Sequence, residues 1–208
     1  MAFCVLAVGA CGSPEEAKPR PLPDVTRELE PGTYRTEEFE PAFYFEVGEG
    51  WTHLPLEKPY DLVLSREQTG LLRFFKARDV YKPDELYGTV EAPEDLVDWL
   101  RRHPYLRTSA PRTVTVGGIE GQRIDAVVVE DLPEDRRVGA CGWDCVTLFG
   151  LGDGTALGVA KGDKARGIFL DDVGDDTVVI GFVGPAAEFD EHAPEAQEVI
   201  DTVEWRDR

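Results

Sequence analysis

The hydrophobic pattern is clearest towards the C-terminus, between Lys164 and Trp205. Ile168–Leu170 and Thr177–Phe182 are short apolar runs, rich in β-branched and aromatic residues, and an acidic turn separates them. Runs of this composition and length, bounded by turn residues, predict two strands. A bare hairpin is marginally stable in water, so we expect at least one face of this pair to be covered.

A short amphipathic helix after these strands supplies the cover. Its apolar residues recur at the spacing of one helical face: Ala196, Val199, Ile200 and Val203. Pro194 suits the first helical position, and Glu195 lies where the helix dipole favours negative charge. The sequence therefore predicts a sheet with this helix packed on it.

Upstream, alternating or short apolar runs predict further strands, and one segment predicts a second helix. The expected strands are Thr33–Phe39, Ala42–Val47, Asp61–Arg66, Leu71–Ala77, Arg112–Val116, Ile119–Glu130 and Cys145–Leu151. The expected helix is Ala92–His103, opened by Pro93 and ended by Pro104. Gly117-Gly118 predicts a two-residue turn, and Val159–Gly167 a loop or edge strand. Short connections between strands favour an α+β fold with a single antiparallel β-sheet covered by helices.

The first residues predict an export signal. Met1–Ala10 is uncharged and mostly apolar, and Val8-Gly9-Ala10-Cys11 resembles a bacterial lipobox, in which small residues precede a cysteine that is lipidated. We interpret residues 1–10 as the remnant of a lipoprotein signal peptide. The expected location is extracytoplasmic, anchored to the cell membrane by a lipidated Cys11. The alternative is a frayed apolar N-terminus.

The segment after Cys11 is rich in proline and charge and poor in large apolar residues. Such a segment has little to bury, and its prolines favour extended backbone. We expect residues 11–31 to be a spacer, and residues 32–208 to form a single globular domain.

Charge limits the classes of partner. The formal net charge is −19, with 42% hydrophobic residues, which is ordinary for a globular domain. A strongly negative field repels nucleic acid and anionic headgroups and attracts cations or basic partners. We expect a monomer that binds no nucleic acid and touches the membrane through its lipid anchor alone.

Two of the four cysteines are close together in a loop of Gly and Asp residues. Cys141 and Cys145 are separated by three residues, whereas a thioredoxin-type redox motif has two between its cysteines. In an exported protein we expect them to form a local disulfide. Free thiols, or metal or redox chemistry, remain alternatives.

Three pieces of sequence together resemble PsbP-like domains. Phe43–Trp51 (FYFEVGEGW) is similar to their opening phrase, Thr113–Arg123 (TVTVGGIEGQR) to their central hairpin, and Thr177–Trp205 to their closing strand and helix. The resemblance implies an α/β/α sandwich built on an antiparallel sheet, and bacterial members include lipid-anchored envelope proteins. It implies no catalysis.

A few side chains are candidates for function. The turn carboxylates Asp171, Asp172, Asp175 and Asp176 are a weak Ca²⁺ candidate, although a solvated hairpin turn explains them as well. Trp51 and Trp143 could contact a ligand or partner, or belong to the core. The three histidines, His53, His103 and His192, are scattered and are interpreted as structural or solvated.

No nucleophile elbow, phosphate-binding loop or zinc motif is present, so we expect no catalytic residue, cofactor or metal. The leading hypothesis is a lipid-anchored, non-catalytic binding or interaction module of the cell envelope, with an envelope protein or a small molecule as its partner. Two alternatives come from other classes: an envelope hydrolase that uses paired carboxylates, and a Ca²⁺-dependent structural domain.

Overall fold

The structure is a computed structural model that describes residues 18–66, 70–85, 87–132, 138–139, 142–174 and 176–206. For Val138, Gly139, Gly142 and Trp143 it describes the backbone alone. No helix in these ranges is long and apolar enough to cross a membrane.

The centre of the molecule is a nine-stranded sheet whose strand pairs are all antiparallel. Its strands follow the order β10-β12-β17-β18-β7-β6-β5-β2, and β11 pairs with β12. They are β2 (Arg27–Glu28), β5 (Trp51–His53), β6 (Asp61–Arg66), β7 (Gly70–Phe75), β10 (Leu106–Thr108), β11 (Arg112–Val116), β12 (Ile119–Val128), β17 (Asp163–Val173) and β18 (Asp176–Pro185).

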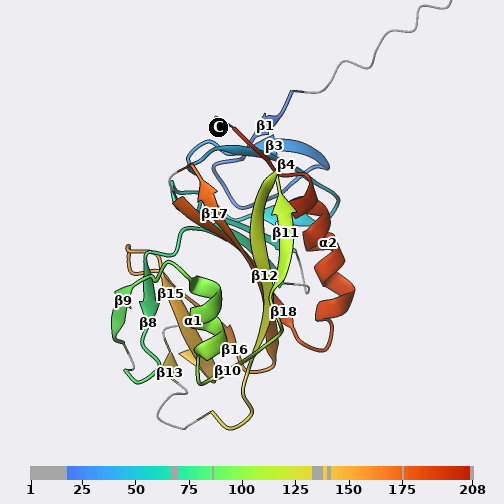
Figure 1. The fold of residues 1–208 in the computed structure, drawn as a ribbon. Coiled ribbons are helices and arrows are strands. Elements are labelled where there is room, and N and C mark those ends of the chain that lie inside the picture. Colours follow the sequence, from blue (N-terminus) through green and yellow to red (C-terminus); the bar gives the residue numbers. More distant parts are fainter. Residues whose placement is uncertain are drawn as a thin grey trace, which may run out of the picture.

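Different layers cover the two faces of this central sheet (Figure 1). One face packs against α2 (Phe189–Asp201) and a four-stranded sheet of β1 (Arg20–Pro21), β3 (Gly32–Arg35), β4 (Phe43–Val47) and β19 (Glu204–Trp205). The other packs against α1 (Leu96–Arg102) and a second four-stranded sheet of β8 (Asp79–Tyr81), β9 (Thr89–Glu91), β15 (Cys145–Gly150) and β16 (Ala156–Ala160). A small pair, β13 (Val138–Gly139) and β14 (Gly142–Trp143), completes the described strands.

The expected single sheet covered by helices is therefore wrong, because several sheets are present and the structure is mostly β. The central strands explain the difference. In β17, Ile168 and Leu170 face one core while Phe169 faces the other, and in β18 Ile180 and Val179 divide in the same way. Successive strand residues point to opposite faces, so an unbroken apolar run needs cover on both faces.

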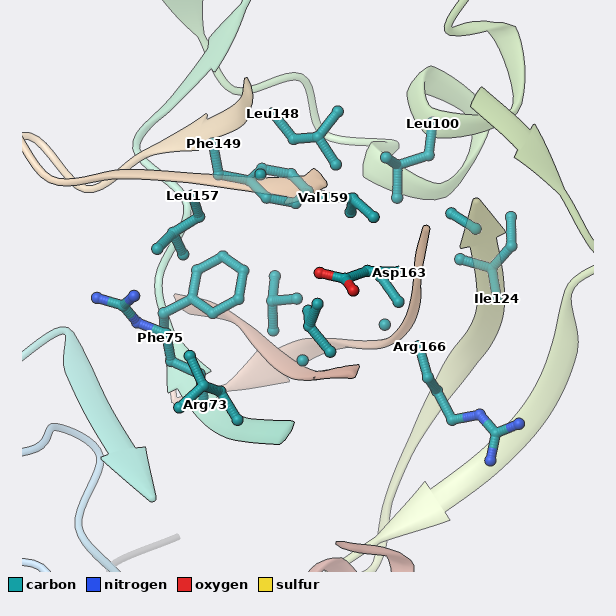
Figure 2. A pocket seen from close by; sticks show the side chains of 18 of the residues that line it. Arg73, Phe75, Leu100, Ile124, Leu148, Phe149, Leu157, Val159, Asp163 and Arg166 are labelled. Carbon is teal, nitrogen blue, oxygen red and sulfur yellow. The ribbon is translucent and has the colours of Figure 1, made fainter. Parts of the chain in front are cut away.

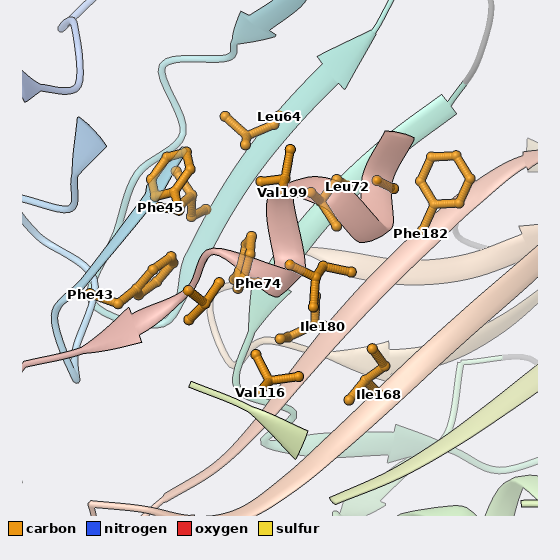
Figure 3. Packing of buried hydrophobic residues seen from close by; sticks show 14 of the residues in the cluster. Phe43, Phe45, Leu64, Leu72, Phe74, Val116, Ile168, Ile180, Phe182 and Val199 are labelled. Atoms are coloured by element: carbon orange, nitrogen blue, oxygen red, sulfur yellow. The ribbon is translucent and has the colours of Figure 1, made fainter. Parts of the chain in front are cut away.

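The core beneath α2 is dominated by aromatic rings (Figure 3). Phe43 is fully buried, with its ring centroid 4.7 Å from that of Phe74 and 5.0 Å from that of Trp205. Val199 packs into the same cluster from α2, together with the rest of the expected stripe. The apolar face predicted for the C-terminal helix is thus confirmed.

The two helices differ from their expected bounds. Helix α2 begins at Phe189, so Pro194 lies inside it instead of at its first position. The fully buried Phe189 anchors the extra N-terminal turn, an effect of packing that periodicity does not reveal. Helix α1 begins later than expected because the Asp95 side chain caps it, accepting a hydrogen bond from the Asp98 N–H at 2.7 Å.

The expected spacer is part of the folded unit from Arg20 onwards, which corrects the domain start at residue 32. Strand β1 pairs with β3 and β2 pairs with β5. Leu22 and Leu29 are 6% and 3% exposed and belong to the core beneath α2. Two isolated leucines among prolines and charges give no periodic signal, so composition alone concealed this packing.

The central hairpin follows local chemistry. Gly117 and Gly118 have φ values of 55° and 79°, which are the conformations that a two-residue turn of this kind requires, and they join β11 to β12 as predicted. The segment 159–167, expected to be a loop or edge strand, is so in part: it ends the edge strand β16, passes through a turn at residues 161–162 and then begins β17, which is a central strand. Strand β17 is longer than its apolar run because it pairs with β12 on one side and β18 on the other.

Candidate functional site

A cavity of about 330 Å³ lies between the central sheet and the sheet formed by β8, β9, β15 and β16 (Figure 2). Its floor comes from β7, β12, β17 and β18, and its roof from β15 and β16, with Leu100 of α1 at one side. The volume falls in the range of small-molecule sites, and the lining is mostly apolar.

Two glycines lie in the floor of the cavity. Gly167 of β17 and Gly181 of β18 are directly opposite each other in the strand register. The Phe169 ring covers Gly167, because a Cβ built there would lie 2.7 Å from that ring, whereas a Cβ built on Gly181 would lie at an ordinary contact distance of 3.5 Å from the Phe75 ring. Gly181 is therefore the position in the floor where an added side chain finds room.

The roof combines bulky and small residues. Phe149 packs against the floor, with its ring centroid 5.4 Å from that of Phe75 and 6.5 Å from that of Phe169. Beside it, β16 contributes Leu157 and Val159, together with the small residues Ala156, Gly158 and Ala160 (Figure 2). The roof therefore presents mostly apolar side chains to the cavity.

Among the described residues that line the cavity, Asp163 is the only carboxylate (Figure 2). Its side chain is partly buried and points into the cavity between apolar residues. Within the described part of the chain it has no hydrogen bond or ion pair. Burial raises the pKa of Asp163, because removal from water penalises the charged form.

The arginines that border the cavity are each paired with a carboxylate. Arg73 donates to both oxygens of buried Asp61, with Nε–Oδ1 at 2.6 Å and Nη2–Oδ2 at 2.5 Å. Arg166 donates to both oxygens of Asp125 at 2.7 and 2.9 Å, and its guanidinium points away from the cavity (Figure 2). Burial is the largest single effect on Asp125 and opposes its ionisation, but the hydrogen bonds from Arg166 together with the positive charges of Arg166, Lys164 and Arg123 outweigh it and lower the pKa.

The candidates from sequence lie elsewhere. Cys11 and Cys141 lie outside the described residues, so lipidation and the disulfide stay predictions; Cys145 is buried at the start of β15. The side chain of Trp143 is likewise not described. Trp51 is 2% exposed and belongs to the core beneath α2, so its ring offers little surface to a ligand.

The acidic turn does not gather its carboxylates. Asp176 pairs with Lys76 at 2.6 Å, and Asp171 accepts a hydrogen bond from the Thr177 hydroxyl at 3.2 Å. Asp172 is exposed, and Asp175 lies outside the described residues. Across the ranges that the structure describes, no group of three or more His, Cys, Asp or Glu side chains could hold a metal ion.

Two histidines proved to be buried. His53 and His103 are 2% and 4% exposed, and burial lowers the pKa of both, that of His103 to about 4. They are core residues of β5 and of the α1 C-terminus, in agreement with a structural interpretation. His192 lies on α2, 3.6 Å from the Glu195 carboxylate.

Sequence reasoning missed the cavity and Asp163. One local signal was available in the sequence. Asp163, Ala165 and Gly167 share one face of β17, so the only large side chain at these three positions is that of Asp163. A carboxylate on a face with so few side chains indicates a polar group inside an apolar cavity. Gly181 could be matched to Gly167 only through the strand register.

Fold and cavity together define a β-rich protein of three layers, with a mostly apolar cavity between two of its sheets. No family model matches the chain, and no curated protein matches it.

Among solved structures, the chain is similar to the cyanobacterial PsbP (CyanoP) from Synechocystis sp. PCC 6803. The TM-score is 0.44 and the sequence identity 10%, and the match covers 95% of this chain and 98% of that chain. Because the TM-score is below 0.5 and the identity is low, no ligand, partner or site residue is taken from the match.

Proposed function

We propose that this protein is a non-catalytic binding module that holds a small, mostly apolar molecule in the cavity between the central sheet and β15–β16. The cavity itself carries the proposal, since its volume of about 330 Å³ and its apolar lining suit such a ligand. Binding of an apolar ligand in an empty apolar cavity is favourable, because it removes apolar surface of the ligand from water.

The lining favours binding over catalysis. Hydrolysis by paired carboxylates needs two carboxyl groups that face one space. The cavity presents only Asp163, while the nearby Asp61 is occupied by Arg73. The described residues around the cavity thus give the paired-carboxylate hydrolase no support.

We also propose the envelope location expected from the sequence, with the protein anchored through lipidated Cys11. The small residues before Cys11 support this. Expression with a complete signal sequence should place the protein in the membrane fraction, and Cys11→Ser should release it or block its processing. Equal membrane association of the two forms would contradict the anchor.

Ligand binding is tested by filling the cavity. Gly181→Leu adds a side chain to the floor, and Gly48→Leu is the matched control, because Gly48 is exposed and a Cβ there meets nothing within 4 Å. Titration with 1-naphthalenemethanol, followed by its fluorescence, should show saturable binding to the wild type and to Gly48→Leu. Gly181→Leu should weaken that binding at least tenfold. Equal binding by all three proteins, or no binding at all, would refute the site.

A further inference from the structure

The strand alternation of β17 isolates a negative charge inside the cavity. Asp163 lies on the cavity face, whereas its basic neighbours Lys164 and Arg166 point to the opposite face. There Lys164 Nζ bonds to Asp190 at 2.8 Å, and Arg166 bonds to Asp125. Neither cation is therefore available to Asp163.

Among the described residues, the other borders of the cavity supply no unpaired cation either. Arg73 is the basic residue on the cavity side of the floor. Its guanidinium donates two hydrogen bonds to the carboxylate of the buried Asp61, one to each oxygen. The cross-strand partner of Asp163 is Pro185, which has neither a charge nor an N–H donor. Burial without a partner raises the pKa of the Asp163 carboxyl.

We propose that the natural ligand of this cavity is a cationic amphiphile, an apolar body bearing an ammonium group that pairs with Asp163. This inference rests on the function proposed above and specifies the ligand class. The apolar lining takes the body of the ligand, and the carboxylate takes its charged end. An opposite charge a few ångströms away favours the ionised carboxylate and offsets its desolvation. The protein's net charge of −19 also attracts such a ligand from solution.

Two probes of the same shape separate charge from apolar contact. 1-Naphthylmethylamine carries an ammonium group at pH 7, and 1-naphthalenemethanol replaces it with a neutral hydroxyl. Both are titrated against the wild type, Asp163→Asn and Glu198→Gln. Glu198 is exposed on α2, so Glu198→Gln changes the net charge by the same amount outside the cavity.

The wild type and Glu198→Gln should bind the amine about tenfold more tightly than the alcohol, while Asp163→Asn should bind the two about equally. Asp163→Asn should also melt no lower than the wild type at pH 7, because the substitution removes a carboxylate that has no partner in the described fold. Binding of the alcohol without any preference for the amine would overturn this inference and leave the binding module standing. A preference that survives in Asp163→Asn would assign it to the overall charge and would also overturn the inference. Failure of both probes to bind would refute the cavity as a site altogether.

Discussion

Acidification should destabilise the protein through His103, the buried histidine at the end of α1. Its Nδ1 accepts a hydrogen bond from the Tyr105 N–H at 3.3 Å, and Nε2 has no partner within the described structure. The ring lies 5.3 Å from that of Trp99 and 5.9 Å from that of Tyr105. A proton added to Nδ1 would break the accepted hydrogen bond and place a charge among aromatic rings.

The magnitude follows from the pKa. Burial lowers the pKa of His103 from 6.5 to about 4 in the folded protein. Below pH 6.5 the His103 imidazole is protonated in the unfolded chain but stays neutral in the folded protein down to about pH 4. The contribution of neutral His103 to the free energy of unfolding is therefore complete above pH 6.5 and is lost as the pH falls towards 4. At 1.36 kcal/mol per pH unit, the loss between pH 7 and pH 4 is about 3 kcal/mol, a large part of a typical domain stability.

Urea unfolding of the wild type and His103→Asn at pH 7 and pH 4 measures this loss. The Asn side-chain oxygen can replace Nδ1 as the acceptor for Tyr105, and it does not titrate. His103→Asn should therefore lose about 3 kcal/mol less than the wild type over this range. His53 and the carboxylates are common to both proteins and cancel in the comparison.

The partly exposed His192 on α2 offers a matched His→Asn substitution outside this aromatic cluster. An identical loss of unfolding free energy in the wild type and His103→Asn would refute the reasoning, because it would show that His103 does not stay neutral in the folded state.

Three further changes test the fold. Val199→Asp should cost several kcal/mol in a thermal or urea melt, because it places a carboxylate in the core beneath α2, whereas Glu198→Lys on the exposed face should cost little. Leu29→Ala should cost about 2–5 kcal/mol, and removal of the chain before Gly32 should lower the melting temperature by many degrees; an unchanged melting temperature would restore the spacer interpretation. If Cys141 and Cys145 are bridged, reduction should cost about 1–3 kcal/mol without global unfolding, and two free thiols by mass spectrometry in oxidised protein would exclude the bond.

Local features of the chain were predictable from sequence because local physics decides them. The apolar stripe is buried as its spacing requires, with Ala196, Val199 and Ile200 on α2 and Val203 just after it. The turn at Gly117-Gly118 needs two positive φ values, which glycine adopts without strain. The two glycines were therefore enough to predict the hairpin of β11 and β12. Strand β4 coincides closely with the alternation of Phe43 and Phe45.

Long-range packing decided the rest. In the sequence, Leu22 and Leu29 are isolated apolar residues of the expected spacer, and only the tertiary structure shows that both pack in the core beneath α2. The number of sheets depends on which apolar faces pack together, and these faces come from segments far apart in the chain. Periodicity shows only that a face is apolar and not which face covers it. Register places Gly167 beside Gly181 in the cavity floor, and the charge of Asp163 is isolated because its basic neighbours bond on the other face of the sheet. Pairings between residues far apart in the chain leave no pattern in either segment alone, so only the tertiary structure could reveal this site.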